Sequence, residues 1–330
     1  MKTISFYLLL PIIFLFLFNS VAISGSPSIL IIESYHSEYP WDESYIQGIK
    51  ENMPGNCVFH IFQMDTKRIP ESEYEKSALK GWAFYLEKKP DLVFLGDDNA
   101  LKYLGPRFAT VDTPVVYLGI NNNPRTYGVT SSANITGVLE RPLLKRSIVE
   151  MRKIIKLKRV LVLFDSGETS RVTFEETFYG QEKMRISNID IHLKRIGSWE
   201  TWQKTVEEAE NDGYDAMIIG LYHTIVDKKN THINAESVLY WTSENTPIPP
   251  FAFWDFAVGP GKAIGGLTLL GKTQGQAAAE MANKILTGIP PNKIQVIHGE
   301  KGKFLFSKSQ LRKHNIRLPE EIVLKATMID

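Results

Sequence analysis

A cluster of aromatic and polar side chains follows the apolar stretch at residues 29–32. Residues 29–32 are all apolar, and residues 33–41 read Glu-Ser-Tyr-His-Ser-Glu-Tyr-Pro-Trp before a helical pattern begins near Asp42. The cluster has aromatic rings, an imidazole and hydroxyls but no glycine cradle for a phosphate. Since ligands bind outside the carboxyl ends of parallel strands, it indicates a surface that holds a small organic molecule without transforming it. Alternatively, Tyr39 and Trp41 only pack the next helix against the sheet.

Two other loops combine carboxylates with the start of a helical pattern. Asp97 and Asp98 follow an apolar stretch, where one carboxylate could pair with a ligand ammonium group and one could cap the next helix. Asp165 and Ser166 present the same two alternatives. A third alternative at Asp165 is that the free amides of the helix N-terminus receive a ligand carboxylate.

The remaining candidate loops carry rings, imidazoles and amides. Trp254 and Asp255 could stack on a planar group and pair with a cation, although alternation sends some neighbouring rings into the core. His36 and His223 could face each other across a cleft, but with no cysteine nearby we expect no metal site. Residues 121–123 are three asparagines, which offer hydrogen bonds but are also common in turns without function.

The candidate ligand-binding residues all lie directly after apolar stretches. They are Ser34, Tyr35, His36, Tyr39, Trp41, Asp97, Asp98, Asn121, Asn122, Asp165, Ser166, Tyr222, His223, Trp254 and Asp255. We expect no catalytic residue, no metal and no cofactor.

Apolar stretches alternate with longer amphipathic segments along the chain, which predicts parallel sheets with helices on both faces. The expected strands are 28–33, 57–62, 91–95, 114–118, 135–139, 159–163, 189–195, 215–219, 249–253 and 263–269. The expected helices are 42–53, 72–88, 98–107, 142–156, 168–185, 199–212, 232–244 and 271–287. The predicted fold class is therefore α/β.

Irregular, polar stretches interrupt this alternation three times, which indicates two Rossmann-like lobes joined by a three-segment hinge with a ligand cleft between them. The expected parts are lobe 1 at 26–120 plus 260–290, lobe 2 at 135–253 plus 300–330, and hinge crossings at 121–134, 254–259 and 291–299.

The N-terminus has the composition of an export signal. Lys2 precedes an apolar core at 4–18, and small residues at 20–24 suit signal peptidase, so residues 1–25 are expected to be a cleavable signal peptide. An uncleaved N-terminal anchor is the alternative. Cys57 is the only cysteine, which excludes an internal disulfide and a lipid-modified cysteine after the apolar core. These features favour a bacterial periplasm.

Charge and catalytic motifs exclude several function classes. The 38 Lys and Arg residues nearly balance the 37 Asp and Glu residues, so no basic field for nucleic acid is expected. The serine-hydrolase elbow, the zinc-protease motif and the phosphate-binding loop are absent from the sequence. A cleft hydrolase using Asp97, Asp98 and Glu33 is the enzyme alternative, and it is disfavoured.

The C-terminal third carries a family resemblance. The stretch from Gly265-Gly266-Leu267 through 275–282 to Ile285-Leu286-Thr287-Gly288 resembles the glycine-strand-helix element of ABC-transporter substrate-binding proteins of the periplasmic type I fold. Residues 306–326 resemble the tail of that family, with His314-Asn315 where a Leu-Gly pair is usual. Asn tolerates the left-handed backbone of Gly, so we expect the turn to survive. The nearest branch is the one that includes tryptophan and tyrosine binders.

The resemblance implies a monomeric periplasmic protein that captures a small polar-aromatic or amino-bearing ligand and delivers it to an inner-membrane ABC permease. The alternative is a receptor that reports its ligand to a separate membrane histidine kinase. Genes for a permease and ATPase, or for a kinase, beside this one would distinguish the two.

Overall fold

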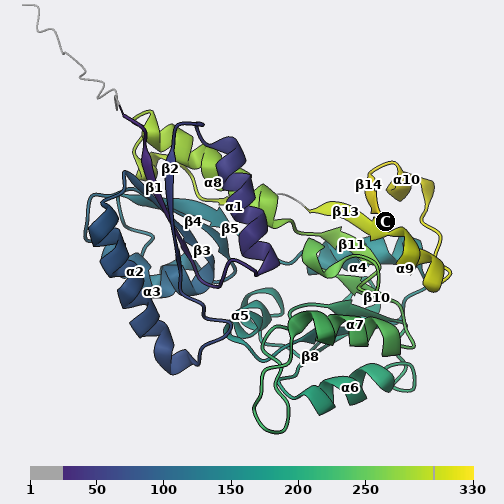
Figure 1. Cartoon of the computed structure of the whole chain (residues 1–330). Helices are drawn as coiled ribbons and strands as arrows, with labels where there is room; N and C mark the ends of the chain where they lie inside the picture. Colours follow the sequence, from purple (N-terminus) through teal and green to yellow (C-terminus); the bar gives the residue numbers. More distant parts are fainter. Residues whose placement is uncertain (1–24, 300–301) are drawn as a thin grey trace, which may run out of the picture.

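The chain folds into two α/β lobes, as the sequence pattern predicts, and a small third sheet that it does not predict (Figure 1). The structure is a computed structural model and describes residues 25–299 and 302–330. The expected signal peptide therefore lies outside the described residues, apart from Gly25. Among the described residues, no helix combines the length and apolar character needed to cross a membrane.

The first lobe contains a parallel six-stranded sheet in the order β12-β5-β4-β3-β1-β2. Its strands are β1 (Ser28–Glu33), β2 (Val58–Gln63), β3 (Leu92–Gly96), β4 (Val115–Ile120), β5 (Ile135–Leu139) and β12 (Ile297–His298). Its helices are α1 (Pro40–Asn52), α2 (Tyr74–Lys88), α3 (Asp97–Phe108) and α8 (Gly271–Leu286).

Alternating side chains of β1 explain why helices cover both faces of this sheet. Ile29 and Ile31 pack in the core that includes α1 and α8, whereas Leu30 and Ile32 pack in the core that includes α2 and α3. Figure 1 shows these two helix pairs on opposite sides of the sheet. All four side chains are fully buried, which accounts for a continuous apolar stretch rather than an alternating one.

The second lobe contains a five-stranded sheet in the order β10-β9-β6-β8-β7, parallel except for the β7–β8 pair. Its strands are β6 (Arg159–Phe164), β7 (Lys183–Ile186), β8 (Ile189–Arg195), β9 (Ala216–Ile219) and β10 (Pro250–Ala252). Its helices are α4 (Leu144–Ile154), α5 (Glu168–Thr177), α6 (Trp199–Glu207) and α7 (Ala235–Asn245).

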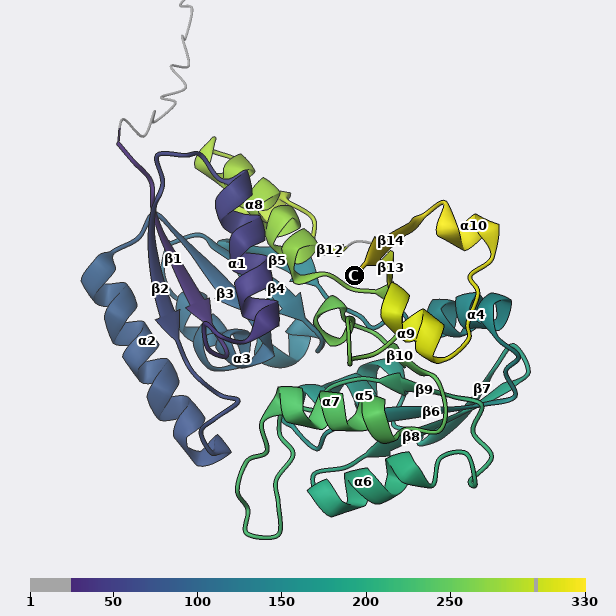
Figure 2. The ribbon, with the colours of Figure 1, turned by 45° about the vertical axis from the view of Figure 1, so that its right-hand side comes forward.

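A third sheet lies between the lobes at the C-terminal end of the chain (Figure 2). It contains β11 (Gly265–Thr268), β13 (Lys303–Ser307) and β14 (Ala326–Ile329), and the short helices α9 (Lys308–Lys313) and α10 (Glu320–Val323) accompany it. Asn315 has a φ of 51°, so it adopts the left-handed backbone expected of it.

Three elements lie outside the parts to which the sequence pattern assigned them. Strand 135–139, expected to open lobe 2, pairs with β4 in the first sheet, and 297–298 in an expected hinge crossing pairs with β5. Residues 265–268, expected in lobe 1, pair with β13 in the third sheet. The pattern identifies strands but not their partners, because sheet pairing depends on contacts far apart in sequence.

The helix expected at 168–185 is wrong in its second half. It ends at Thr177, and residues 183–186 form β7 in a hairpin with β8. Tyr179 and Gly180 have φ values of 56° and 68°, and two successive left-handed residues cannot continue a right-handed helix.

Candidate ligand-binding site

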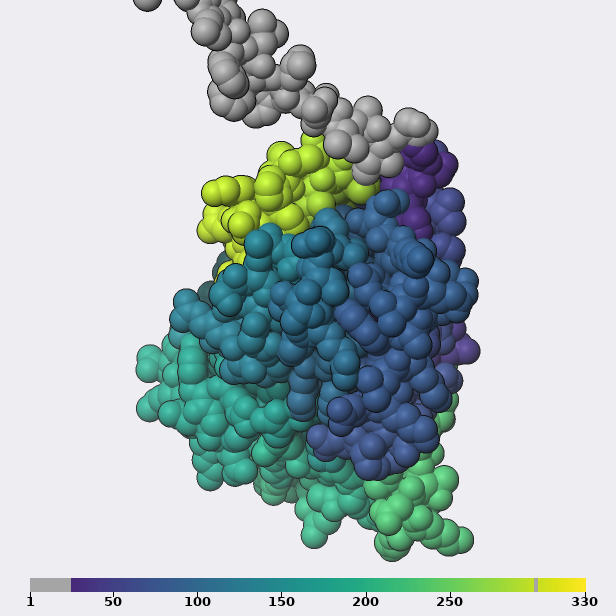
Figure 3. Space-filling model, turned by 90° about the vertical axis from the view of Figure 1, so that its left-hand side faces the viewer, coloured from purple at the N-terminus to yellow at the C-terminus, as the bar shows by residue number. Residues whose placement is uncertain are grey.

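A small cavity of about 10 Å³, with room for about one water molecule, lies where the two closed lobes meet. The lobes lie directly against each other along the boundary seen in Figure 3. The cavity is lined from the first lobe by Tyr35, Tyr39, Trp41, Asp97, Asn121 and Glu140, and from the second by Thr169, Leu221, Trp254 and Phe256. Six of these ten residues are among the candidates nominated from the sequence.

Local hydrogen bonds hold the first loop over the cavity. Ser34 Oγ donates to the Gly96 carbonyl at 2.6 Å and accepts from the Ala100 amide at 2.8 Å, which ties the end of β1 to the start of α3. The Tyr35 amide donates to Asp42 Oδ2 at 3.2 Å. Ser34 and Asp42 therefore position the loop rather than line the cavity.

Asp97 and Trp41 bring unpaired polar atoms to the cavity. Asp97 Oδ1 accepts from the Tyr35 hydroxyl at 3.3 Å, whereas the buried Asp97 Oδ2 and Trp41 Nε1 have no hydrogen-bond partner among the described residues. Gly119, with a φ of 71°, leaves room for both, because a Cβ there would lie 3.3 Å from Asp97 Oδ2 and 3.4 Å from Trp41 Nε1. Asp97 itself has a φ of 67°, a strained backbone of the kind found at functional sites.

Glu140 is the carboxylate that the sequence reasoning missed. Its oxygens accept from Trp254 Nε1 at 2.5 Å and Asn121 Nδ2 at 3.3 Å, while the buried Asn121 Oδ1 has no partner within residues 25–299 and 302–330. Glu140 directly follows β5, so the strand-end rule could have found it.

The cavity therefore contains two carboxyl groups in a setting that disfavours charge. Burial, with the neighbouring charges of Glu140 and Asp98, raises the pKa of Asp97 well above its usual range. Burial, opposed by the Trp254 hydrogen bond and reinforced by Asp98, raises the pKa of Glu140 to about 8. Either protons or a bound cation must compensate these groups.

Aromatic rings form the rest of the wall. The rings of Trp254 and Phe256 are nearly parallel, with centroids 6.2 Å apart and an interplanar angle of 15°. From the first lobe, the Tyr39 ring meets the edge of His223 at a centroid distance of 4.8 Å. Such faces suit a flat or cationic group enclosed between the lobes.

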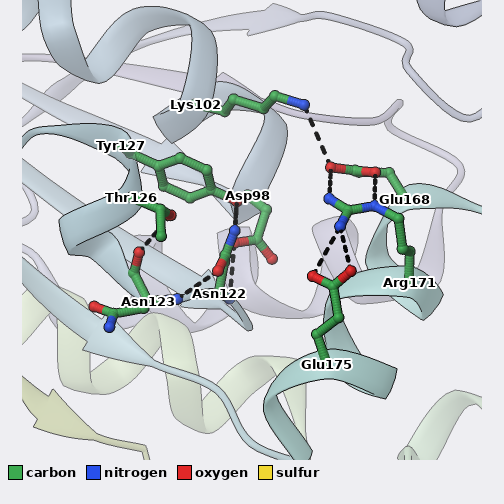
Figure 4. Close-up of polar contacts among 9 residues, drawn as sticks. All are labelled: Asp98, Lys102, Asn122, Asn123, Thr126, Tyr127, Glu168, Arg171 and Glu175. Carbon is green, nitrogen blue, oxygen red and sulfur yellow. Dashed lines mark hydrogen bonds and ion pairs between the residues drawn. The ribbon is translucent and has the colours of Figure 1, made fainter. Parts of the chain in front are cut away.

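Polar contacts also join the lobes beside the cavity. The hydroxyls of Tyr35 and Thr169 are 2.9 Å apart, and Lys102 Nζ lies 3.3 Å from Glu168 Oε1. Figure 4 shows that Glu168 also pairs with Arg171, which in turn binds Glu175 on the same helix. The Tyr35 and Lys102 contacts are available only when the lobes are closed.

Several nominated residues stabilise loops instead of lining the cavity. Asp98 accepts from the amides of Asn121 and Asn122, each at 3.0 Å, and from the Tyr127 hydroxyl at 3.1 Å (Figure 4). Asn122 Nδ2 donates to the same tyrosine at 2.9 Å. Of the two neighbouring aspartates, Asp98 therefore has the structural role and Asp97 faces the cavity.

The aspartates of the second lobe have similar structural roles. Asp165 accepts from the amides of Gly167, His223 and Thr224, so it organises two loops at once. Asp255 is half-buried and accepts from the Phe256 amide at 2.9 Å.

The remaining nominated residues line wider grooves outside the cavity. His36, Tyr222 and His223 line one groove between the lobes, together with Lys67. Ser166 lines a second groove, which Lys67 also lines. Glu33, invoked for the hydrolase alternative, lines a third groove beside α1 and not the cavity.

This chain belongs to the ABC transporter substrate-binding protein family, whose model matches residues 87–329. The two-lobed architecture is the type I periplasmic binding protein fold. No curated protein matches the sequence.

Solved structures share the fold at low sequence identity. One is an ABC domain in complex with L-Trp from Streptococcus pneumoniae, with TM-score 0.66, 16% identity, and coverage of 93% of this chain and 100% of that one. A conserved domain protein from Vibrio cholerae has TM-score 0.65 and 14% identity, over 92% and 100%. A ligand-free, open substrate-binding protein with adhesive properties from Clostridium difficile has TM-score 0.62 and 16% identity, over 92% and 100%.

Proposed function

We propose that this protein captures a small amino-bearing or polar-aromatic compound in the cavity between its lobes and delivers it to an ABC permease. The observation that carries the proposal is the cavity itself, which both lobes line and which contains buried polar atoms without partners. Such atoms are costly unless a ligand or water satisfies them.

The geometry accounts for capture by closure. The cavity has side chains from both lobes, so opening the lobes would separate Tyr35 from Thr169 and expose the carboxyl groups of Asp97 and Glu140. A ligand that contacts both lobes stabilises the closed state by its differential affinity for it. Hydrogen bonds and rings then give specificity.

The proposed location is the periplasm, after export directed by residues 1–25. Membership of a substrate-binding family supports this location and a permease partner. The bound compound is proposed to be released unchanged, because capture needs only reversible closure. A separate sensor kinase in place of the permease would use the same binding step.

Replacing the cavity tryptophans tests the site. The protein is purified without denaturation, and the compound that co-purifies is extracted and identified by mass spectrometry. The affinity of the wild-type protein and of each variant for this compound is then measured by calorimetry. Trp41→Ala and Trp254→Ala should each weaken binding by about 1–3 kcal/mol, or about 5- to 150-fold in Kd, because each removes a ring that contacts the ligand.

Trp82→Ala provides the matched control. Trp82 packs against Tyr85 and Phe108 in the first lobe, remote from the cavity lining, so its loss should lower stability without changing affinity. Unchanged affinity in both folded cavity variants would reject the proposed site.

A further inference from the structure

Two carboxyl groups and no cationic side chain line the cavity. Asp97 and Glu140 are among its ten lining residues, and none of the ten is Lys, Arg or His. Asp97 is 2% exposed and Glu140 is 2% exposed, so water cannot screen either group effectively. An amino acid would need a cationic or strongly donating partner for its own carboxylate.

The nearest cations are held outside the cavity. The Arg141 guanidinium donates to the carbonyls of Ile120, Glu140 and Asn122, at 2.7, 2.6 and 3.1 Å. Lys67 Nζ lies 4.5 Å from the centroid of the Tyr35 ring, and Lys67 lines the outer grooves. Neither side chain lines the cavity where it could receive a ligand carboxylate.

The N-terminus of α5, the other potential anion site, already has a carboxylate. Asp165 Oδ1 accepts from the Gly167 amide and the Ser170 hydroxyl, and Oδ2 accepts from the His223 amide. Glu168 adds a second acidic side chain in the first turn. A ligand carboxylate there would be repelled by both groups.

The neutral Trp41 Nε1–H is an unpaired donor, but the acceptors that lack a partner among the described residues match an ammonium group. Asp97 Oδ2 and Asn121 Oδ1 are buried acceptors without donors, and Glu140 lies beside Asn121. The indole rings of Trp41 and Trp254 line the same space and provide faces for a cation. The closed cavity has a volume of only about 10 Å³, so the lobes must part for a ligand to enter, and a small ligand requires the least separation.

We infer that the cavity selects a small organic cation without a carboxylate, an amine or quaternary ammonium compound, over an amino acid. This inference rests on the proposed function and narrows its ligand class. The cation would replace the missing positive charge beside Asp97 and Glu140.

Matched pairs of compounds test the inference by calorimetry. Tyramine and tyrosine share the ring and nitrogen and differ only in the carboxylate, and choline and glycine betaine form a quaternary pair. We expect at least one cation to bind at least tenfold more tightly than its carboxylate-bearing partner. Asp97→Asn and Glu140→Gln should each weaken binding of that cation at least tenfold.

Glu33→Gln is the control for charge removal, because Glu33 is also buried but lines a different groove. It should leave the affinity for the cation unchanged. Circular dichroism and thermal unfolding establish that each variant is folded.

Two results would overturn the inference. Tighter binding of tyrosine or betaine, or a co-purifying amino acid, would leave solute capture standing and reject the cation. Absence of binding by all four compounds, with no co-purifying cation in mass spectra, would reject the inference as well. Absence of any co-purifying compound and of any ligand in a broad thermal-shift screen would reject the proposed function itself.

Discussion

At the scale of single residues, buried carboxyl groups in and near the cavity make the stability of the folded protein depend on pH. Burial raises the pKa of Glu140 to about 8 and that of Glu33 to about 7. Burial also raises the pKa values of Asp98 and Asp255 to about 6. Each folded carboxyl group therefore retains a proton at a pH where the unfolded chain has lost it.

The sign of the stability change follows from this retention. Between about pH 4.5 and pH 8 the folded protein binds more protons than the unfolded chain, so the free energy of unfolding of the empty protein should fall as pH rises. Each such proton contributes up to about 1.4 kcal/mol per pH unit. Glu140→Gln should flatten the part of the curve between about pH 6 and pH 8, as measured by urea unfolding.

The groups facing Glu140 limit this prediction. Asp98 opposes ionisation of Glu140 and Arg141 favours it. The variant should reduce the slope without abolishing it, because Glu33, whose pKa burial raises to about 7, still titrates. Glu43→Gln, on an exposed position of α1, should leave the slope unchanged. Stability of the empty protein that rises steadily from pH 5 to pH 8 would contradict the account.

Some residues of the site could be predicted from the sequence and others could not. Tyr35, Tyr39 and Trp41 were found because they cluster directly after one strand. The sequence could not separate Asp97 from Asp98, because adjacent carboxylates look alike until the backbone orients them. In the structure, Asp98 accepts hydrogen bonds from the amides of the following loop. Asp97 has a left-handed backbone and lines the cavity.

At the scale of elements, the close crossing of α1 and α8 supports the first loop. A Cβ added at Gly275 would lie 2.0 Å from the Tyr45 carbonyl, and one at Gly48 would lie 2.2 Å from the Lys272 carbonyl. These contacts involve backbone atoms, which cannot move without separating the helices. Glycine is therefore required for close approach at this crossing.

Gly275→Ala should lower the free energy of unfolding by about 1–3 kcal/mol, because the helices must separate to accept the methyl group. Chemical denaturation followed by circular dichroism measures the loss. Gly55→Ala is the matched control, since a Cβ there meets nothing within 4 Å, and it should leave stability nearly unchanged. Equal stability of the two variants would refute the tight crossing.

Most strands and helices could be predicted because their apolar residues follow the period of each element. Pairing could not. Strand β5 follows the polar stretch that looked like a crossing, yet it completes the first sheet and presents Glu140 to the cavity. The same error of pairing thus hid the second carboxylate of the site.

At the scale of the whole molecule, the account describes closure around a cavity that both lobes complete. The Tyr35–Thr169 contact and the Lys102–Glu168 ion pair cross the boundary beside it. Lys102 and Glu168 are partly exposed, so their ion pair contributes little energy alone. A ligand that contacts both lobes adds to the stability of the closed state.

The crystal structure of the protein purified from its native host without denaturation tests the central claim most directly. We predict closed lobes and one bound compound in the cavity, with a cationic nitrogen within about 3.5 Å of a carboxylate oxygen of Asp97 or Glu140. A compound bound elsewhere on the molecule, with the cavity containing only water, would contradict the account.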